Sequence, residues 1–148
     1  MAYRIRGVVL PDDEVRDVFV VDGRITFEEV EGAETLLQDG VLVPGLVDVH
    51  AHLAIASPAP EGSSTRERAE ASARAHLDAG VLVVREPGSL DHSSNGIGPS
   101  DGLPRTFTGG RFLAPPGGYF PGLARDVTDD DLPDAAAEEA RASGAWAR

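Results

Sequence analysis

The sequence predicts a mixed α/β protein in which a small all-β segment, residues 1–44, precedes parallel βα units, residues 45–148. After Pro44, apolar strand-like runs alternate with helix-like segments, which is the order that βα units produce. The first run, residues 41–53, carries two histidines near its end, where a parallel barrel keeps its functional groups. We therefore expect about three βα units of an incomplete parallel barrel.

The N-terminal segment reads as a meander of short strands. Residues 4–10, 15–21 and 24–30 have strand character, and one or two further strands fall within residues 35–43. Asp22-Gly23 separates the second strand from the third, and Asp-Gly tolerates the positive φ angles of a type I′ hairpin turn.

Two histidines mark the strand predicted for residues 41–53. Side chains alternate along a strand, so Asp48, His50 and His52 share one face, while Val47 and Val49 lie on the face that helices would cover. Neutral imidazole is a common metal ligand, so the pair predicts a metal site. A purely structural role for both histidines is the alternative.

A helix is predicted from Ser64 to Ala79. Ser64-Thr-Arg-Glu67 has the spacing of a capping box, and Gly80 is a typical stop signal. Helical spacing turns one side inward, with the residues Ala69, Ala73, His76 and Leu77. His76 is therefore expected to be a helix residue rather than a ligand.

The second strand, residues 81–84, is a continuous apolar run suited to a buried parallel strand. Arg85, Glu86 and His92 follow it, at the end where a barrel keeps its chemistry. Arg85 and Glu86 either contact a substrate or pair with each other or with solvent.

The third strand is predicted at residues 103–108, and a long Gly- and Pro-rich loop, residues 109–122, follows it. Within this loop, Arg111 and Tyr119 are candidates to bind a substrate carboxylate or carbonyl, or have a structural role. The acidic residues 129–131 open a last helix, whose dipole they complement, and residues 145–148 would begin a fourth strand.

Several of these segments resemble the amidohydrolase superfamily. Residues 40–53 look like the opening of its barrel, where H-x-H on the first strand binds the first metal. Residues 22–25, Asp-Gly-Arg-Ile, resemble a turn of its N-terminal β-sandwich. Residues 79–88 and 109–119 resemble the second strand and the third-strand loop of imidazolonepropionase-like and prolidase-like members. The resemblance implies the N-terminal part of a TIM (β/α)8 barrel preceded by a small β-sandwich segment.

The resemblance also implies an activity: hydrolysis of a C–N bond, in an amide or cyclic amide, by a metal-activated water. The expected cofactor is a divalent metal, Zn²⁺ first, with one or two ions in the complete enzyme, and the expected partner is a small-molecule amide. The implied roles are metal ligation by His50 and His52, support by Asp48, and substrate contact by Glu86, Arg111 and Tyr119.

Length and composition set limits on this interpretation. A complete barrel takes about 250 residues, so we expect a chain that needs a missing C-terminal barrel half or an oligomer partner. All 13 basic residues are Arg, so the carboxylated Lys that bridges two metals in related enzymes is absent, and no catalytic acid or base is assigned in this chain. The alternative is a catalytically inactive remnant that acts as an oligomeric or binding module. Downstream sequence supplying Lys and His at strand ends would discriminate the two.

Charge and cysteine content narrow the function classes further. A formal net charge of −12 argues against nucleic acid and anionic membrane surfaces as partners. The sequence has no Cys, which excludes disulfides and thiolate metal sites, and no phosphate loop or serine-nucleophile motif. Without a long apolar run, it predicts neither a signal peptide nor a membrane span, so we expect a cytoplasmic protein.

Overall fold

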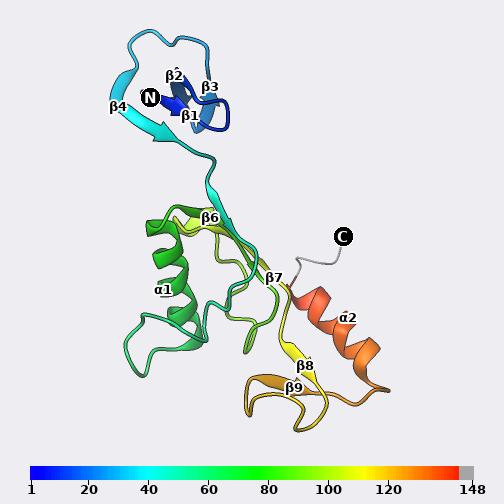
Figure 1. Cartoon of the computed structure of the whole chain (residues 1–148). Coiled ribbons are helices and arrows are strands. Elements are labelled where there is room, and N and C mark those ends of the chain that lie inside the picture. Colours follow the sequence, from blue (N-terminus) through cyan, green and yellow to red (C-terminus); the bar gives the residue numbers. More distant parts are fainter. Residues whose placement is uncertain (144–148) are drawn as a thin grey trace. The chain divides into compact units, whose positions relative to one another are not determined.

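The computed structural model describes residues 1–143. The chain divides into two compact units, Met1–Pro44 and Gly45–Arg148, each with its own sheet (Figure 1). No helix in the described part of the chain combines the length and the apolar content needed to cross a bilayer.

The N-terminal unit contains a four-stranded sheet in the order β3-β2-β1-β4. Its strands are β1 (Ala2–Val9), β2 (Glu14–Val21), β3 (Arg24–Thr26) and β4 (Glu34–Leu42). β1 pairs antiparallel with β2, and β2 with β3, but β4 runs parallel to β1. The predicted meander is therefore wrong at its last strand, because residues 27–33 carry the chain from one edge of the sheet to the other.

The turn between β2 and β3 has the predicted geometry. Asp22 and Gly23 have φ angles of 48° and 76°, and positive φ at both central residues defines a type I′ turn. β3 is shorter than predicted because the chain turns directly after it. The hydroxyl of Thr26 accepts the backbone N–H of Glu28 at 3.1 Å, which ends the strand.

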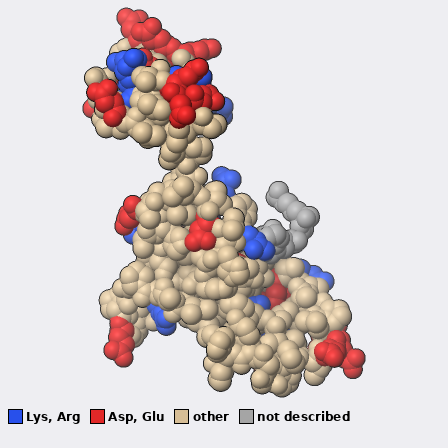
Figure 2. All heavy atoms as spheres, in the orientation of Figure 1, with Lys and Arg blue, Asp and Glu red and all other residues tan. Residues whose placement is uncertain are grey.

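This unit has a small core and a charged surface. Val18 and Phe19 are buried, whereas Ile25, Phe27 and Val41 are more than half exposed. Figure 2 shows acidic and basic side chains gathered on this unit, while the visible face of the other unit carries mostly uncharged side chains. The sheet therefore leaves apolar side chains uncovered beside its charges.

The second unit begins with a parallel sheet in the order β5-β6-β7. Its strands are β5 (Leu46–Asp48), β6 (Val81–Glu86) and β7 (Arg105–Thr108). Helix α1 (Thr65–Asp78) connects β5 to β6 and packs against β6 (Figure 1). The 3₁₀ helix η1 (Pro99–Asp101) follows β6 and precedes β7 in the chain. These elements confirm a mixed α/β fold with parallel strands.

Helix α1 has the ends that its sequence predicts. The Ser64 hydroxyl accepts the Glu67 N–H, and the Glu67 carboxylate accepts the Ser64 N–H at 2.8 Å, which completes a capping box. Gly80 follows the helix with a φ of 85°, a left-handed conformation that favours glycine. Ala69 and Ala73 are fully buried, as the helical spacing predicts.

The core of the second unit lies where α1 covers β6. It contains the buried residues Leu53, Ala54, Ala69, Ala73, Val84, Ile97 and Leu103. Val47 and Val49 were expected on a covered face, but they are 57% and 64% exposed. The expectation is wrong because α1 packs against β6, not β5, which forms the edge of the three-stranded sheet.

The remainder of this unit contains two short strands and a helix. β8 (Phe112–Ala114) pairs parallel with β9 (Ala124–Asp126), and α2 (Leu132–Ser143) follows. The prediction of an irregular loop over residues 109–122 is therefore wrong for β8. The fourth strand predicted at residues 145–148 lies outside the described residues.

Candidate metal centre

His50 and His52 lie directly beyond the end of β5, not within it as predicted. The strand ends at Asp48, and the next pairing with β6 is a single hydrogen bond from Ala51 N–H to the Arg85 carbonyl, at 3.0 Å. The imidazole rings of His50 and His52 nevertheless converge, with their Nε2 atoms 3.2 Å apart and their planes edge to face. The two-residue spacing thus places both rings on the same side, even though the backbone has left the strand.

The distance between the two Nε2 atoms fits a shared cation. Two Zn–N bonds of about 2.0–2.1 Å at a tetrahedral angle would place the nitrogens about 3.3 Å apart. The observed 3.2 Å is close to this spacing. His50 and His52 could therefore hold one metal ion with little rearrangement.

His52 has its ring orientation set by a backbone carbonyl. Its Nδ1 lies 2.7 Å from the carbonyl oxygen of Gly88, which follows β6. Because a carbonyl only accepts, Nδ1 is the nitrogen that donates in this contact, which leaves Nε2 facing His50. Such a partner on the other nitrogen is a common feature of metal-binding histidines.

Asp48 supports the pair through the backbone. Its Oδ1 accepts the His50 N–H at 2.9 Å, and its Oδ2 lies 3.2 Å from Nε2 of His76 on α1. The pKa of Asp48 lies below its ordinary value, chiefly because of the hydrogen bond from the His50 N–H. Burial raises this pKa, and the hydrogen bond with His76 lowers it. The contact with His76 was not foreseen from the sequence.

Glu86 lies beneath the histidine loop and is only 1% exposed. Its Oε1 accepts the Leu53 N–H at 2.8 Å, and its Oε2 has no hydrogen-bond partner within residues 1–143. Burial raises the pKa of Glu86, although nearby Ser94, which does not reach hydrogen-bonding geometry, and the Leu53 N–H both favour the charged form. Glu86 thus holds the residue that follows His52, and a direct contact with substrate would require this loop to move.

Arg111 is bound to a glutamate of α2. Its backbone N–H and its Nε donate to Glu139, both at 2.9 Å. Arg125 and His92 also reach this carboxylate, at 3.3 Å and 2.6 Å. Burial opposes ionisation of Glu139, but the hydrogen bonds from Arg111 and His92 outweigh it and lower its pKa to about 2. The sequence indicated only that Glu139 belongs to a helix.

Tyr119 belongs to a row of aromatic rings that starts at the histidine pair. Phe112 lies 5.0 Å from the His52 ring, Tyr119 stacks on Phe112 at 5.3 Å, and Phe120 meets Tyr119 edge to face at 5.3 Å. Tyr119 and Phe120 are 43% and 68% exposed. The row therefore connects a candidate metal ligand to an exposed apolar surface, and Phe112 and Phe120 were not identified from the sequence.

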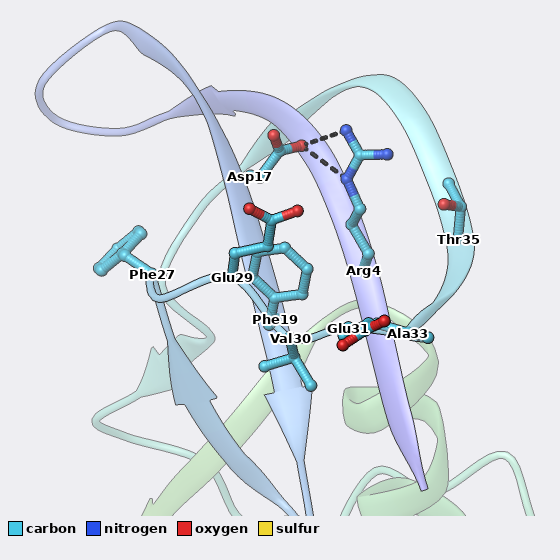
Figure 3. Close-up of a pocket in the computed structure, with 10 residues that line it drawn as sticks. Arg4, Asp17, Phe19, Phe27, Glu29, Val30, Glu31, Ala33 and Thr35 are labelled. Carbon is cyan, nitrogen blue, oxygen red and sulfur yellow. Dashed lines mark hydrogen bonds and ion pairs between the residues drawn. The ribbon is translucent and has the colours of Figure 1, made fainter.

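Two cavities are relevant to function. One, of about 350 Å³, borders His52 and is lined mainly by apolar side chains of residues 53–58 and α1. The other, of about 490 Å³, lies within the N-terminal unit, where Arg4 and Asp17 face each other (Figure 3) and form an ion pair of 2.8 Å. Because these two charges are paired, we take the first cavity as the candidate site.

A third metal ligand is not found in the described part of the chain. Within residues 1–143, no group of three or more His, Asp and Glu side chains is arranged to hold a metal ion. Catalytic zinc sites generally use three protein ligands and a water. Within the described residues, His50 and His52 would therefore supply two of the three protein ligands that such a site needs.

Solved structures that share this fold include amidohydrolases and prolidases. The chain matches a crystal structure of an amidohydrolase with a TM-score of 0.74 and 22% identity, over 99% of this chain and 45% of that one. It matches a putative prolidase from Bifidobacterium longum with a TM-score of 0.73 and 19% identity, over 95% of this chain and 38% of that one. A Xaa-Pro dipeptidase with bound methionine gives a TM-score of 0.66 and 18% identity, over 98% and 45%. The chain thus shares its fold with part of each of these amidohydrolase and prolidase structures, as the resemblance implied.

Relatives of higher identity are mycobacterial. The chain is 37% identical over 145 residues to the uncharacterized protein Rv2915c of Mycobacterium tuberculosis (strain ATCC 25618 / H37Rv) and to the uncharacterized protein Mb2939c of Mycobacterium bovis. The match covers 97% of this chain and 38% of each relative. No protein-family model matches the chain.

Proposed function

We propose that this chain provides the first two metal ligands of a metal-dependent amidohydrolase that cleaves a C–N bond in a small amide or cyclic amide. The observation that carries the proposal is the convergence of His50 and His52, whose Nε2 atoms lie 3.2 Å apart. The likeness in fold to amidohydrolases and prolidases supports the hydrolase class.

The proposed architecture is a TIM barrel whose first strands are β5, β6 and β7, with a small β-sandwich formed around the N-terminal sheet. The parallel order of the three strands and the single crossover helix α1 support the barrel. The histidines leave the C-terminal end of β5, the end at which barrel enzymes place their catalytic groups.

The proposed cofactor is a divalent metal, with Zn²⁺ as the first choice and one or two ions in the complete site. Two imidazole nitrogens and no thiolate suit zinc among several divalent metals. When bound, Zn²⁺ supplies Lewis acidity that polarises a carbonyl and acidifies water. In this chain, His50 and His52 would hold the ion, Gly88 orients His52, and Asp48 supports His50.

The proposed substrate side consists of Tyr119, Arg111 and Glu86. The aromatic row from His52 to Tyr119 would place an apolar group of the substrate beside the metal site. Arg111 remains 35% exposed while it is paired with Glu139, so its guanidinium can also contact a carboxylate. Glu86 would act beneath the loop, through the hydrogen bond to Leu53.

A Zn²⁺ titration followed by NMR tests the metal site. The chain has four histidines, so the ring resonances can be assigned with single His→Gln variants. We expect Zn²⁺ to shift the resonances of His50 and His52 and to leave that of His92 unchanged. H52Q should remove the response of His50, whereas H92Q, the matched control, should keep it. Equal shifts at every histidine, or none at His50 and His52, would contradict the metal site.

A second candidate function is an inactive oligomeric or binding module. It is favoured by the exposed apolar side chains of the N-terminal unit, among them Ile25, Phe27 and Val41. Light scattering on the metal-free chain, together with the Zn²⁺ titration, separates the two functions. Stable oligomers without a zinc response at His50 and His52 would support the module.

A further inference from the structure

The carboxylate of Asp48 connects the candidate ligand His50 to helix α1. One oxygen accepts the His50 N–H at 2.9 Å, and the other lies 3.2 Å from Nε2 of His76. Asp48 is the last residue of β5, so this carboxylate is positioned where the chain leaves the strand. A contact of Asp with the N–H two residues later is an Asx turn, which sets the local path of the backbone.

His76 is held on its other side by the helix that carries it. Its Nδ1 lies 2.7 Å from the Ser72 carbonyl, one turn earlier in α1. A carbonyl and a carboxylate both accept hydrogen bonds, so each ring nitrogen of His76 lies beside an acceptor. The ring therefore forms a fixed bridge from the backbone of α1 to the Asp48 carboxylate.

The bridge between His76 and Asp48 is partly shielded from solvent. The side chains of His76 and Asp48 are 24% and 35% exposed, and the bridge joins segments 28 residues apart in the sequence. α1 itself is fixed by its buried face against β6, so it offers a rigid point of attachment. An Asx turn tied to such a point keeps one geometry, whereas a free one can exchange its acceptor with water.

We propose that His76 is a positioning residue, which holds the Asp48 carboxylate and through it the backbone of His50 in the geometry that brings the two Nε2 atoms together. The inference rests on the proposed function, because metal binding is the role it gives to the convergence of His50 and His52. It differs from the sequence-based expectation, which treated His76 as an ordinary helix residue.

The first experiment needs no metal. Amide hydrogen exchange at His50, measured by NMR in the intact chain, reports on the Asx turn directly. We expect H76L to raise the exchange rate of the His50 amide about tenfold, the effect of losing roughly one hydrogen bond that fixes the turn. H76Q keeps a donor near the position of Nε2 and should retain most of the protection. R74L is the matched control, because Arg74 lies on the same helix and donates to Gly102, not to Asp48.

The second experiment adds Zn²⁺. H76L should weaken zinc binding at His50 and His52 about tenfold, while H76Q and R74L stay near the unmodified chain. D48N should weaken it as well, and the double variant D48N/H76L should lose no more than D48N alone, because His76 acts through Asp48.

The outcomes separate this inference from the proposed function. His50 exchange in H76L that equals that of R74L, with α1 amides still protected, would overturn the positioning role whether or not zinc binds. Faster His50 exchange in H76L that H76Q restores would support the role, even if the unmodified chain showed no zinc response and the metal site itself failed. Additive losses in D48N/H76L would show that His76 does not act through Asp48, and this would also overturn the inference.

Discussion

Replacing Glu139 with Gln should destabilise α2 far more than the same replacement at its exposed neighbour Glu138. The Glu139 side chain is 4% exposed, and its carboxylate accepts hydrogen bonds from Arg111, Arg125 and His92. Its pKa falls from 4.5 to about 2 in the folded chain. A shift of this size corresponds to about 3 kcal/mol of stability at neutral pH, or more than a hundredfold in an equilibrium constant.

Hydrogen exchange of the α2 amides is the assay, because it reports the local opening that releases Glu139. At neutral pH, E139Q should speed exchange in α2 by about a hundredfold, up to the limit set by global unfolding. E138Q is the matched control: Glu138 is 58% exposed and pairs only with Arg125 among the contacts described for it, so its loss should cost under about 1 kcal/mol.

The pH dependence gives a second check on Glu139. Because its pKa is depressed in the folded state, the stabilisation is present above about pH 4.5 and is lost as the pH falls toward 2. The difference in α2 exchange between the unmodified chain and E139Q should therefore disappear over this range. If the α2 exchange rates of E139Q and the unmodified chain differ by less than threefold at neutral pH, or still differ strongly at pH 2, the reasoning is refuted.

Three further outcomes are expected. S64A removes the capping box of α1 and should destabilise the first turn of the helix by about 1 kcal/mol, measured as faster amide exchange there, whereas S64D should keep this stability. G110A should loosen α2, because a Cβ at Gly110 would lie 2.8 Å from that of Glu139, whereas G62A, at a similar φ but with open space around it, isolates the cost of backbone strain. The isolated chain with Zn²⁺ should hydrolyse no amide, because two histidines leave the site short of a ligand, and chelator-sensitive turnover would contradict this.

The elements that could be predicted from sequence are those with local signals. The capping box of α1 depends on residues three positions apart, and the turn at Asp22-Gly23 depends on two neighbours. The convergence of His50 and His52 likewise follows from their spacing, although the strand ends before them. In each case, the contacts lie within one turn of the chain, where backbone preferences decide the geometry.

The parts that could not be predicted depend on distant segments. The bridge from Asp48 to His76 spans 28 positions, and so does the contact of Arg111 with Glu139. Neither pair has a sequence pattern, because only the packing of a helix against a strand brings its members together. The exposure of Val49 was missed for the same reason, since its apolar character does not show which strand α1 covers.

The geometry of the histidine pair is built entirely from contacts within the second unit. Gly88 orients His52, Glu86 holds the next residue through Leu53, and Asp48 with its bridge holds His50. These contacts are all made by the protein itself, so folding meets part of the cost of arranging His50 and His52. It follows that weak zinc binding by this chain would reflect the number of ligands and not their arrangement. Adding one carboxylate or imidazole donor at the site should then raise the affinity steeply, because the first two ligands need no further ordering.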